Sequence, residues 1–236
     1  MKRFKSEKNL RFKVVLFWLL FLHMGSILAA ENDFQLWTNL TATGTVSKEQ
    51  PKVKYWFESQ GRFGENASTF SQFLVRPGIG YQLLPSTSVW IGYAWIHTSL
   101  PFATTPNNEN RIWQQILWNN KSERFLFTLR SRLEQRSLPN TLHTAWRYRQ
   151  LLKISYFIPH HEKFTLIGME EIFYHMNNFN QQKNSGLDQN RAFIGIGIKA
   201  TAQSTIEVGY LNQNIRRNPR ADFNGNCLYL SLLLSN

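Results

Sequence analysis

Strict alternation of side-chain character is the feature of this sequence that most restricts its fold. In Arg130–Arg136, RSRLEQR, charged side chains occupy every second position. Segments 52–62, 192–199 and 204–213 likewise set branched or aromatic residues against charged residues, amides or glycine. A period of two places successive side chains on opposite faces of a β-strand, whereas helical periodicity is scarce after residue 30. The alternation therefore predicts an all-β chain.

Eleven segments of this kind can be traced through the sequence. One face of each is apolar and nearly free of charge, and the other mixes Arg, Lys, Glu and Gln with glycine. The segments are approximately 33–46, 52–63, 69–84, 88–97, 109–119, 123–137, 144–158, 164–176, 189–200, 204–214 and 225–235. Bacterial single-chain barrels normally have an even number of strands, so we expect about ten to twelve, with a strand missed near the N-terminus or an incomplete first segment.

Three features favour a closed antiparallel transmembrane β-barrel over a soluble sandwich. Glycines recur on the charged face, where a crowded lumen needs space for long side chains. Aromatic residues make up 14% of the chain, and Trp and Tyr often lie near strand ends, as in an interfacial girdle. From the third segment on, short and long connections alternate, as they do in outer-membrane barrels. The glycines concerned are Gly78, Gly80, Gly92, Gly195, Gly197 and Gly209.

The N-terminus has the order of a secretory signal peptide. Basic residues precede the apolar run Val14–His23, and small residues follow up to Ala30. We expect cleavage after Ala30, with an uncleaved anchor as the alternative, and one barrel domain over residues 31–236. The formal net charge is +12, but nucleic acid is excluded as a partner of an exported protein. We expect an outer-membrane location, with membrane lipid, lipopolysaccharide and the barrel insertion machinery as partners; the oligomeric state stays open.

The charged face is expected to line the barrel interior. Arginines and glutamates at this density predict a ladder of paired charges that packs the lumen, because unpaired buried charges cost several kcal/mol each. Arginine exceeds glutamate, so a narrow anion-selective path or an anionic ligand site is the alternative. Neighbouring Glu170 and Glu171 cannot both face inward, which predicts a bulge or a rim position for one of them. The expected lumen residues are Glu58, Arg62, Arg76, Glu109, Arg111, Arg130, Arg132, Glu134, Arg136, Arg147, Arg149, Glu171, Arg191 and Glu207.

An ordered set of motifs resembles a bacterial domain-of-unknown-function family, number twenty-four ninety in that series. The set covers nearly all of the chain after the leader. The resemblance implies an exported, outer-membrane-like β-barrel and implies no particular activity. The motifs are NENRIWQQ (Asn108–Gln115), RSRLEQR (Arg130–Arg136), WRYR (Trp146–Arg149), EEIF (Glu170–Phe173), DQNR (Asp188–Arg191) and EVGYLNQ (Glu207–Gln213).

Two other functional classes stay open. His97 and Ser99 are two residues apart near a strand end, similar to the His-x-Ser of barrel lipid A deacylases, and Glu109 beyond the next loop is placed to orient the histidine. These three are the candidate catalytic residues of a membrane-embedded lipid hydrolase; a rim histidine beside a loop serine is the simpler interpretation. The other class is a soluble periplasmic β-sheet binding protein with its charged face outward. No cofactor or metal site is expected, since no phosphate-binding loop or Cys/His ligand spacing occurs.

Overall fold

The computed structural model describes residues 31–236, except 140, 162, 182–183 and 218–220. The expected signal peptide, residues 1–30, lies outside the described residues. Over the described ranges, no helix is long and apolar enough to cross a bilayer.

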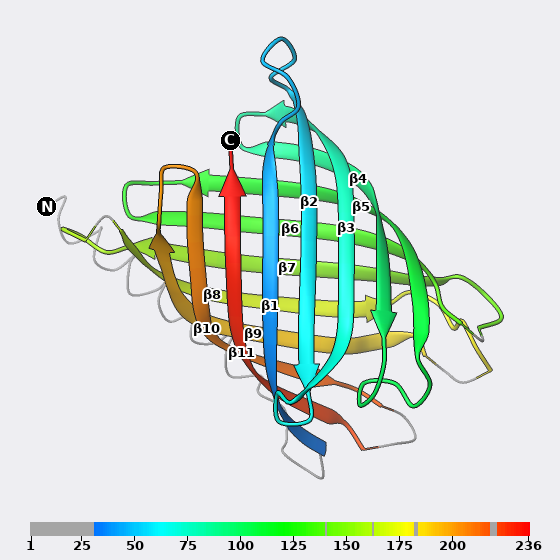
Figure 1. The fold of residues 1–236 in the computed structure, drawn as a ribbon. Helices are drawn as coiled ribbons and strands as arrows, with labels where there is room; N and C mark the ends of the chain where they lie inside the picture. Colours follow the sequence, from blue (N-terminus) through cyan, green and yellow to red (C-terminus); the bar gives the residue numbers. More distant parts are fainter. Residues whose placement is uncertain (1–30, 140, 162, 182–183, 218–220) are drawn as a thin grey trace, which may run out of the picture. The chain divides into compact units, whose positions relative to one another are not determined.

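The described chain forms a closed barrel of eleven strands (Figure 1). Consecutive strands are neighbours around the ring. Each expected segment forms one strand, with ends within a few residues of those predicted. The all-β barrel expected from the alternation is therefore confirmed. The strands are β1 (Glu31–Thr45), β2 (Val53–Gly64), β3 (Thr69–Leu84), β4 (Thr87–Thr98), β5 (Asn107–Lys121), β6 (Phe125–Ser137), β7 (Ala145–Phe157), β8 (Phe164–His175), β9 (Gly186–Lys199), β10 (Ser204–Ile215) and β11 (Phe223–Ser235).

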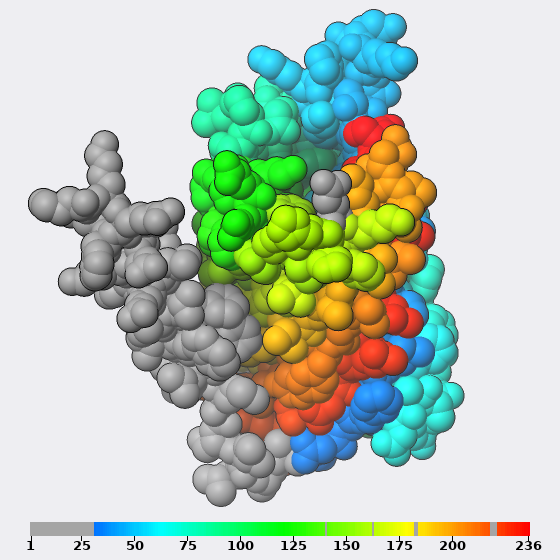
Figure 2. Space-filling model, turned by 90° about the vertical axis from the view of Figure 1, so that its left-hand side faces the viewer, coloured from blue at the N-terminus to red at the C-terminus, as the bar shows by residue number. Residues whose placement is uncertain are grey.

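The ring closes through a parallel ladder between the first and last strands. β1 and β11 pair in parallel from Glu31 opposite Phe223 to Thr43 opposite Ser235. Figure 2 shows the two strands, blue and red, side by side. An odd number of alternating strands leaves the first and last running in the same direction, so closure requires one parallel pair. Over the described residues, neither explanation expected for the odd count applies, because β1 is a complete strand of 15 residues and the eleven strands already close the ring.

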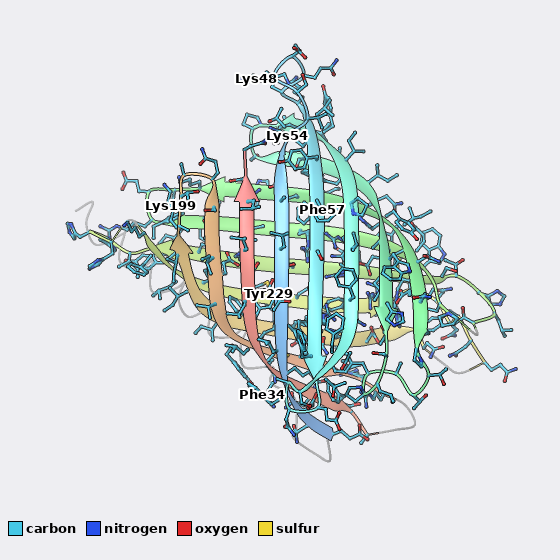
Figure 3. The ribbon with its side chains drawn as sticks, in the orientation of Figure 1. Phe34, Lys48, Lys54, Phe57, Lys199 and Tyr229 are labelled. Carbon is cyan, nitrogen blue, oxygen red and sulfur yellow. The ribbon has the colours of Figure 1, made fainter. Side chains whose placement is uncertain are left out.

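The two ends of the barrel differ in their connections. The short-turn end carries the connections after β3, β5, β7 and β9, and the long-loop end carries those after β4, β6, β8 and β10. The C-terminus lies at the short-turn end, together with Lys48 and Lys199, whereas Phe34 lies at the opposite end (Figure 3). The short turns are residues 85–86, 122–124, 158–163 and 200–203, and the long loops are 99–106, 138–144, 176–185 and 216–222.

Apolar side chains cover the outside of the barrel, and charged side chains fill much of the inside. Ile194 on β9 is 65% exposed, whereas its neighbour Phe193, which points inward, is 2% exposed. Arg132 and Glu134 on the inner face of β6 are both 0% exposed. The alternative with the charged face directed to solvent is therefore wrong.

The interior also holds aromatic clusters that the charged lumen did not predict. Trp90 and Trp113 pack with Leu74 and Ile96 near β3, β4 and β5, and a second cluster surrounds Trp37. Gly78, Gly80 and Gly92 make room for these indole rings rather than for arginines. A Cβ on Gly78 would lie 2.5 Å from the Trp113 ring. Space for indole rings is thus the reason for glycine at this part of the inner face.

Candidate functional site in the barrel interior

One fully buried carboxylate, Glu134, organises the centre of the lumen. Arg147 Nη2 lies 2.6 Å from its Oε2, and Arg149 Nη1 lies 2.7 Å from its Oε1. Arg76 and Arg111 approach the same carboxylate to 3.9 and 3.8 Å. Register explains the arrangement, because Glu134 is the cross-strand partner of Arg147, and residues two apart on β7 share the inner face. Guanidinium groups from β3, β5 and β7 therefore converge on β6.

A second cluster of charges lies toward the long-loop end. Glu109 accepts hydrogen bonds from Arg111 Nε at 2.6 Å and from Arg136 Nε at 2.5 Å. Arg136 also donates to His175 Nε2 at 3.0 Å. Asp188 Oδ2 lies 3.6 Å from Arg147, which links this cluster to the central one.

A third cluster faces the short-turn end. Glu171 binds Arg130 at 2.7 Å and Arg149 at 2.8 Å, and Arg191 lies 3.9 Å from it. On the neighbouring wall, Arg76 donates to both oxygens of Glu58 at 2.8 Å. Nearer the rim, Lys153 Nζ lies 2.5 Å from Glu207. Arg76 and Arg149 each contact two carboxylates and so join this cluster to Glu134.

Two arginines of the lumen have no carboxylate within 4 Å among the described residues. Arg132 donates from Nε and Nη2 to Gln115 Oε1 at 2.9 and 2.6 Å, and its guanidinium lies 4.8 Å from the Trp113 ring. Arg62 donates to Gln60 at 2.7 Å and lies 3.9 Å from the Trp37 ring. Amide oxygens and aromatic faces therefore stabilise these two cations.

The structure places the lumen residues expected from the sequence on the inner face. Asp188 also points inward, a position that alternation alone does not predict because it depends on a register shift between Phe173 and Tyr174. The inward position of Trp37 and Trp113 could have been read from the alternation, since both lie on the charged face, but their contacts with particular arginines could not.

The position of Glu170 differs from the expectation that one of the two neighbouring glutamates lies at a bulge or near the rim. Glu171 faces the lumen as expected, whereas Glu170 lies on the outer face in the middle of β8 and accepts a hydrogen bond from Asn190. The bulge expected near this pair lies further along the strand, after Phe173. Ordinary alternation therefore separates the two glutamates without a bulge.

The three candidate catalytic residues, His97, Ser99 and Glu109, are not brought together in the structure. His97 Nδ1 lies 2.9 Å from Asn108 Oδ1, and Ser99 Oγ contacts the backbone oxygens of Phe70 and Ser71 at 3.4 Å. Glu109 lies inside the barrel, bound to two arginines, and does not orient His97. Within the described residues, no three His, Cys, Asp or Glu side chains gather as potential metal ligands.

The middle of the lumen is packed with side chains. Trp113, Arg132 and Glu134 come from β5 and β6, project inward and are each 0% exposed. Side chains that lined an aqueous channel would keep solvent contact, so this level of the barrel is closed by packing.

The lumen opens into a vestibule at the short-turn end. This cavity has a volume of about 610 Å³. Asn119 and Ser235 line it and are exposed, so it reaches the rim. Its inner end is formed by the third charge cluster, and the Nε atoms of Arg76 and Arg130 have no hydrogen-bond partner among the described residues. Apolar wall residues include Leu151, Ile167, Phe193 and Tyr229.

Comparisons with known proteins identify the family. Residues 34–224 match the family described as "Protein of unknown function (DUF2490)". An uncharacterized protein of Methylorubrum extorquens is 30% identical over 186 residues, which cover 78% of this chain and 79% of the relative. The NanC porin, solved in a rhombohedral crystal form, is similar with a TM-score of 0.49 and 11% identity, over 81% of this chain and 93% of the porin chain. The chain therefore belongs to the DUF2490 family, as the order of its motifs predicted.

Proposed function

We propose that this protein is an outer-membrane β-barrel with a closed lumen, whose vestibule binds a small anionic ligand. The apolar outer face supports the membrane location, because a closed barrel satisfies its backbone hydrogen bonds internally and presents apolar side chains to lipid. In outer-membrane barrels the short turns face the periplasm, which gives the vestibule a periplasmic opening. The ligand then enters and leaves on that side without crossing the barrel.

The excess of cations around the vestibule carries the proposal for an anion. Arg76, Arg130, Arg149, Arg191 and Lys153 line the cavity, whereas the acidic residues that line it are Glu58, Glu171 and Glu207. Charge-assisted hydrogen bonds from the lining arginines and Lys153 to carboxylate or phosphate oxygens would hold such an anion. The apolar walls would accommodate a short aliphatic portion of the same ligand.

Calorimetric titration of the folded, detergent-solubilised protein tests this function. Inorganic phosphate and succinate are the anionic probes, and glycerol is the neutral control. We expect both anions to bind and Arg130→Gln to weaken binding about tenfold, the loss typical of one charge-assisted hydrogen bond.

Arg136→Gln is the matched control, because it also removes a buried arginine bound to a glutamate but lies outside the vestibule. We expect this variant to keep wild-type affinity for the anions. Absence of anion binding, or equal losses in the two variants, contradicts the proposed ligand site.

A further inference from the structure

A polar patch interrupts the apolar outer face across four neighbouring strands. It consists of Ser131 on β6, Gln150 on β7, Glu170 on β8 and Asn190 on β9, one residue per strand. Apolar residues lie beyond it toward both ends, for example Leu166 and Tyr174 on β8, which are each 48% exposed. In a barrel surrounded by lipid, these four polar side chains would face hydrocarbon.

Hydrogen bonds inside the chain satisfy the patch only in part. Ser131 Oγ and Tyr148 Oη both donate to Gln150 Oε1, at 2.6 and 2.5 Å. Among the described residues, the amide nitrogen of Gln150 donates only to the Leu151 carbonyl oxygen, at a long 3.4 Å. Glu170 accepts from Asn190, its single side-chain donor among the described residues. The patch therefore holds a spare donor on β7 and spare carboxylate acceptors on β8.

Within one chain, this donor and these acceptors bond other groups and not each other. Gln150 is the cross-strand partner of Ile172, and Glu170 is the partner of Leu152, so the two polar residues are diagonal neighbours. Diagonal neighbours lie within reach of long side chains, but Glu170 makes such a contact with Asn190 of β9 and not with Gln150. Unpaired polar groups in hydrocarbon cost free energy, so a partner that pairs both would be favoured.

We propose that this polar patch is an interface for a second copy of the chain in the membrane. Copies inserted in the same direction are related by a two-fold axis along the membrane normal. Such an axis at the seam between β7 and β8 sets β7 of one copy against β8 of the other. Gln150 of each copy then donates to Glu170 of its partner, and the two pairs form symmetrically.

The surface beside Glu170 also suits a closely packed barrel. Gly168 precedes Glu170 on the same outer face, and Ala192 is the cross-strand partner of Glu170. Small residues at contacts in membranes let two backbones approach and form hydrogen bonds across the interface. The inference rests on the outer face alone and is independent of a ligand in the vestibule.

Energy transfer between labelled copies in lipid vesicles tests the dimer. The full chain carries a donor or acceptor dye at Lys48→Cys, in the exposed β1–β2 turn, while native Cys227 is buried. Transfer is measured as the protein is diluted with lipid. We expect wild-type dimers, and we expect Glu170→Leu and Gln150→Leu each to weaken association about tenfold or more, because each removes both symmetric bonds.

Asn212→Leu is the matched control, since Asn212 is an outward polar residue of β10 that bonds Asn224 at 2.7 Å, away from the β7–β8 seam. A heat-dependent gel shift verifies that every variant is folded. The proposal is overturned if wild-type transfer never exceeds that of randomly distributed copies, if either β7–β8 variant keeps wild-type association, or if Asn212→Leu weakens association as much as they do.

Discussion

Glu134 and Arg132 are two residues apart on the inner face of β6, and both are fully buried, but their surroundings differ. Four arginines surround Glu134, whereas Arg132 has an amide acceptor, aromatic neighbours and an Nη1 without a partner among the described atoms. Removal of a shared buried carboxylate leaves several cations uncompensated, whereas replacement of a poorly paired buried charge by an apolar side chain of similar volume is often neutral or stabilising.

We therefore expect opposite responses to two substitutions at this level of the barrel. Glu134→Gln should lower the free energy of unfolding by about 3–5 kcal/mol. Arg132→Met should leave it within about 1 kcal/mol of wild type or raise it. Guanidinium chloride unfolding in detergent, followed by tryptophan fluorescence, measures both values. A larger loss for Arg132→Met than for Glu134→Gln would show that Arg132, and not the carboxylate, holds the network together.

Alternation predicted which charged residues face inward, because an inward position on a strand depends only on parity. The same rule assigns Trp56 and Trp113 to the inside, but composition cannot reveal that they lie beside Arg132. Asp188 could not be placed, since a bulge reverses parity at that point and depends on pairing with β8. The pairing of His97, Ser99 and Glu109 failed for a similar reason, because proximity in sequence across a loop does not fix the face on which a side chain lies.

Strands could be recognised one by one from their period of two, but the closure of the ring could not. The parallel β1–β11 ladder joins segments at opposite ends of the chain, and each strand alone is compatible with either direction of its neighbour. The odd count was the available signal, since it forces one parallel pair once the ring is closed. Because bacterial single-chain barrels normally have even numbers of strands, the odd count favoured a missed or incomplete strand over a parallel pair.

Thiol cross-linking tests this ladder in the folded protein. Leu40 and Leu232 are cross-strand partners on the outer face of β1 and β11. In a Cys227→Ala background, we expect Leu40→Cys with Leu232→Cys to react with dibromobimane in high yield, since neighbouring strands are about 4.8 Å apart. Leu40→Cys with Leu228→Cys is the control, because Leu228 pairs with Leu36. Equal yields, or a higher yield in the control, would contradict the parallel register.

Across the whole molecule, the packing of the interior differs between the two ends of the barrel. Charge clusters and indole rings fill the middle and the long-loop half, and the vestibule occupies the short-turn half. In the packed region, carboxylates and guanidinium groups compensate most of one another's charge. The vestibule gives solvent access only to the third cluster, where cations exceed carboxylates. A closed barrel with the proposed binding cavity at one end accounts for both halves.

This arrangement predicts the electrical behaviour of the protein in a planar bilayer. We expect no steady open-channel current from wild type, because side chains with no solvent exposure close the barrel at Trp113 and Arg132. Trp113→Ala combined with Arg132→Ala removes the largest of these side chains and should produce a current that favours anions, since the remaining lumen keeps more arginines than carboxylates. Reversal potentials in a chloride gradient measure that preference, and a heat-dependent gel shift of the same sample verifies folding. A large steady current from wild type would show that the packed level opens in the membrane.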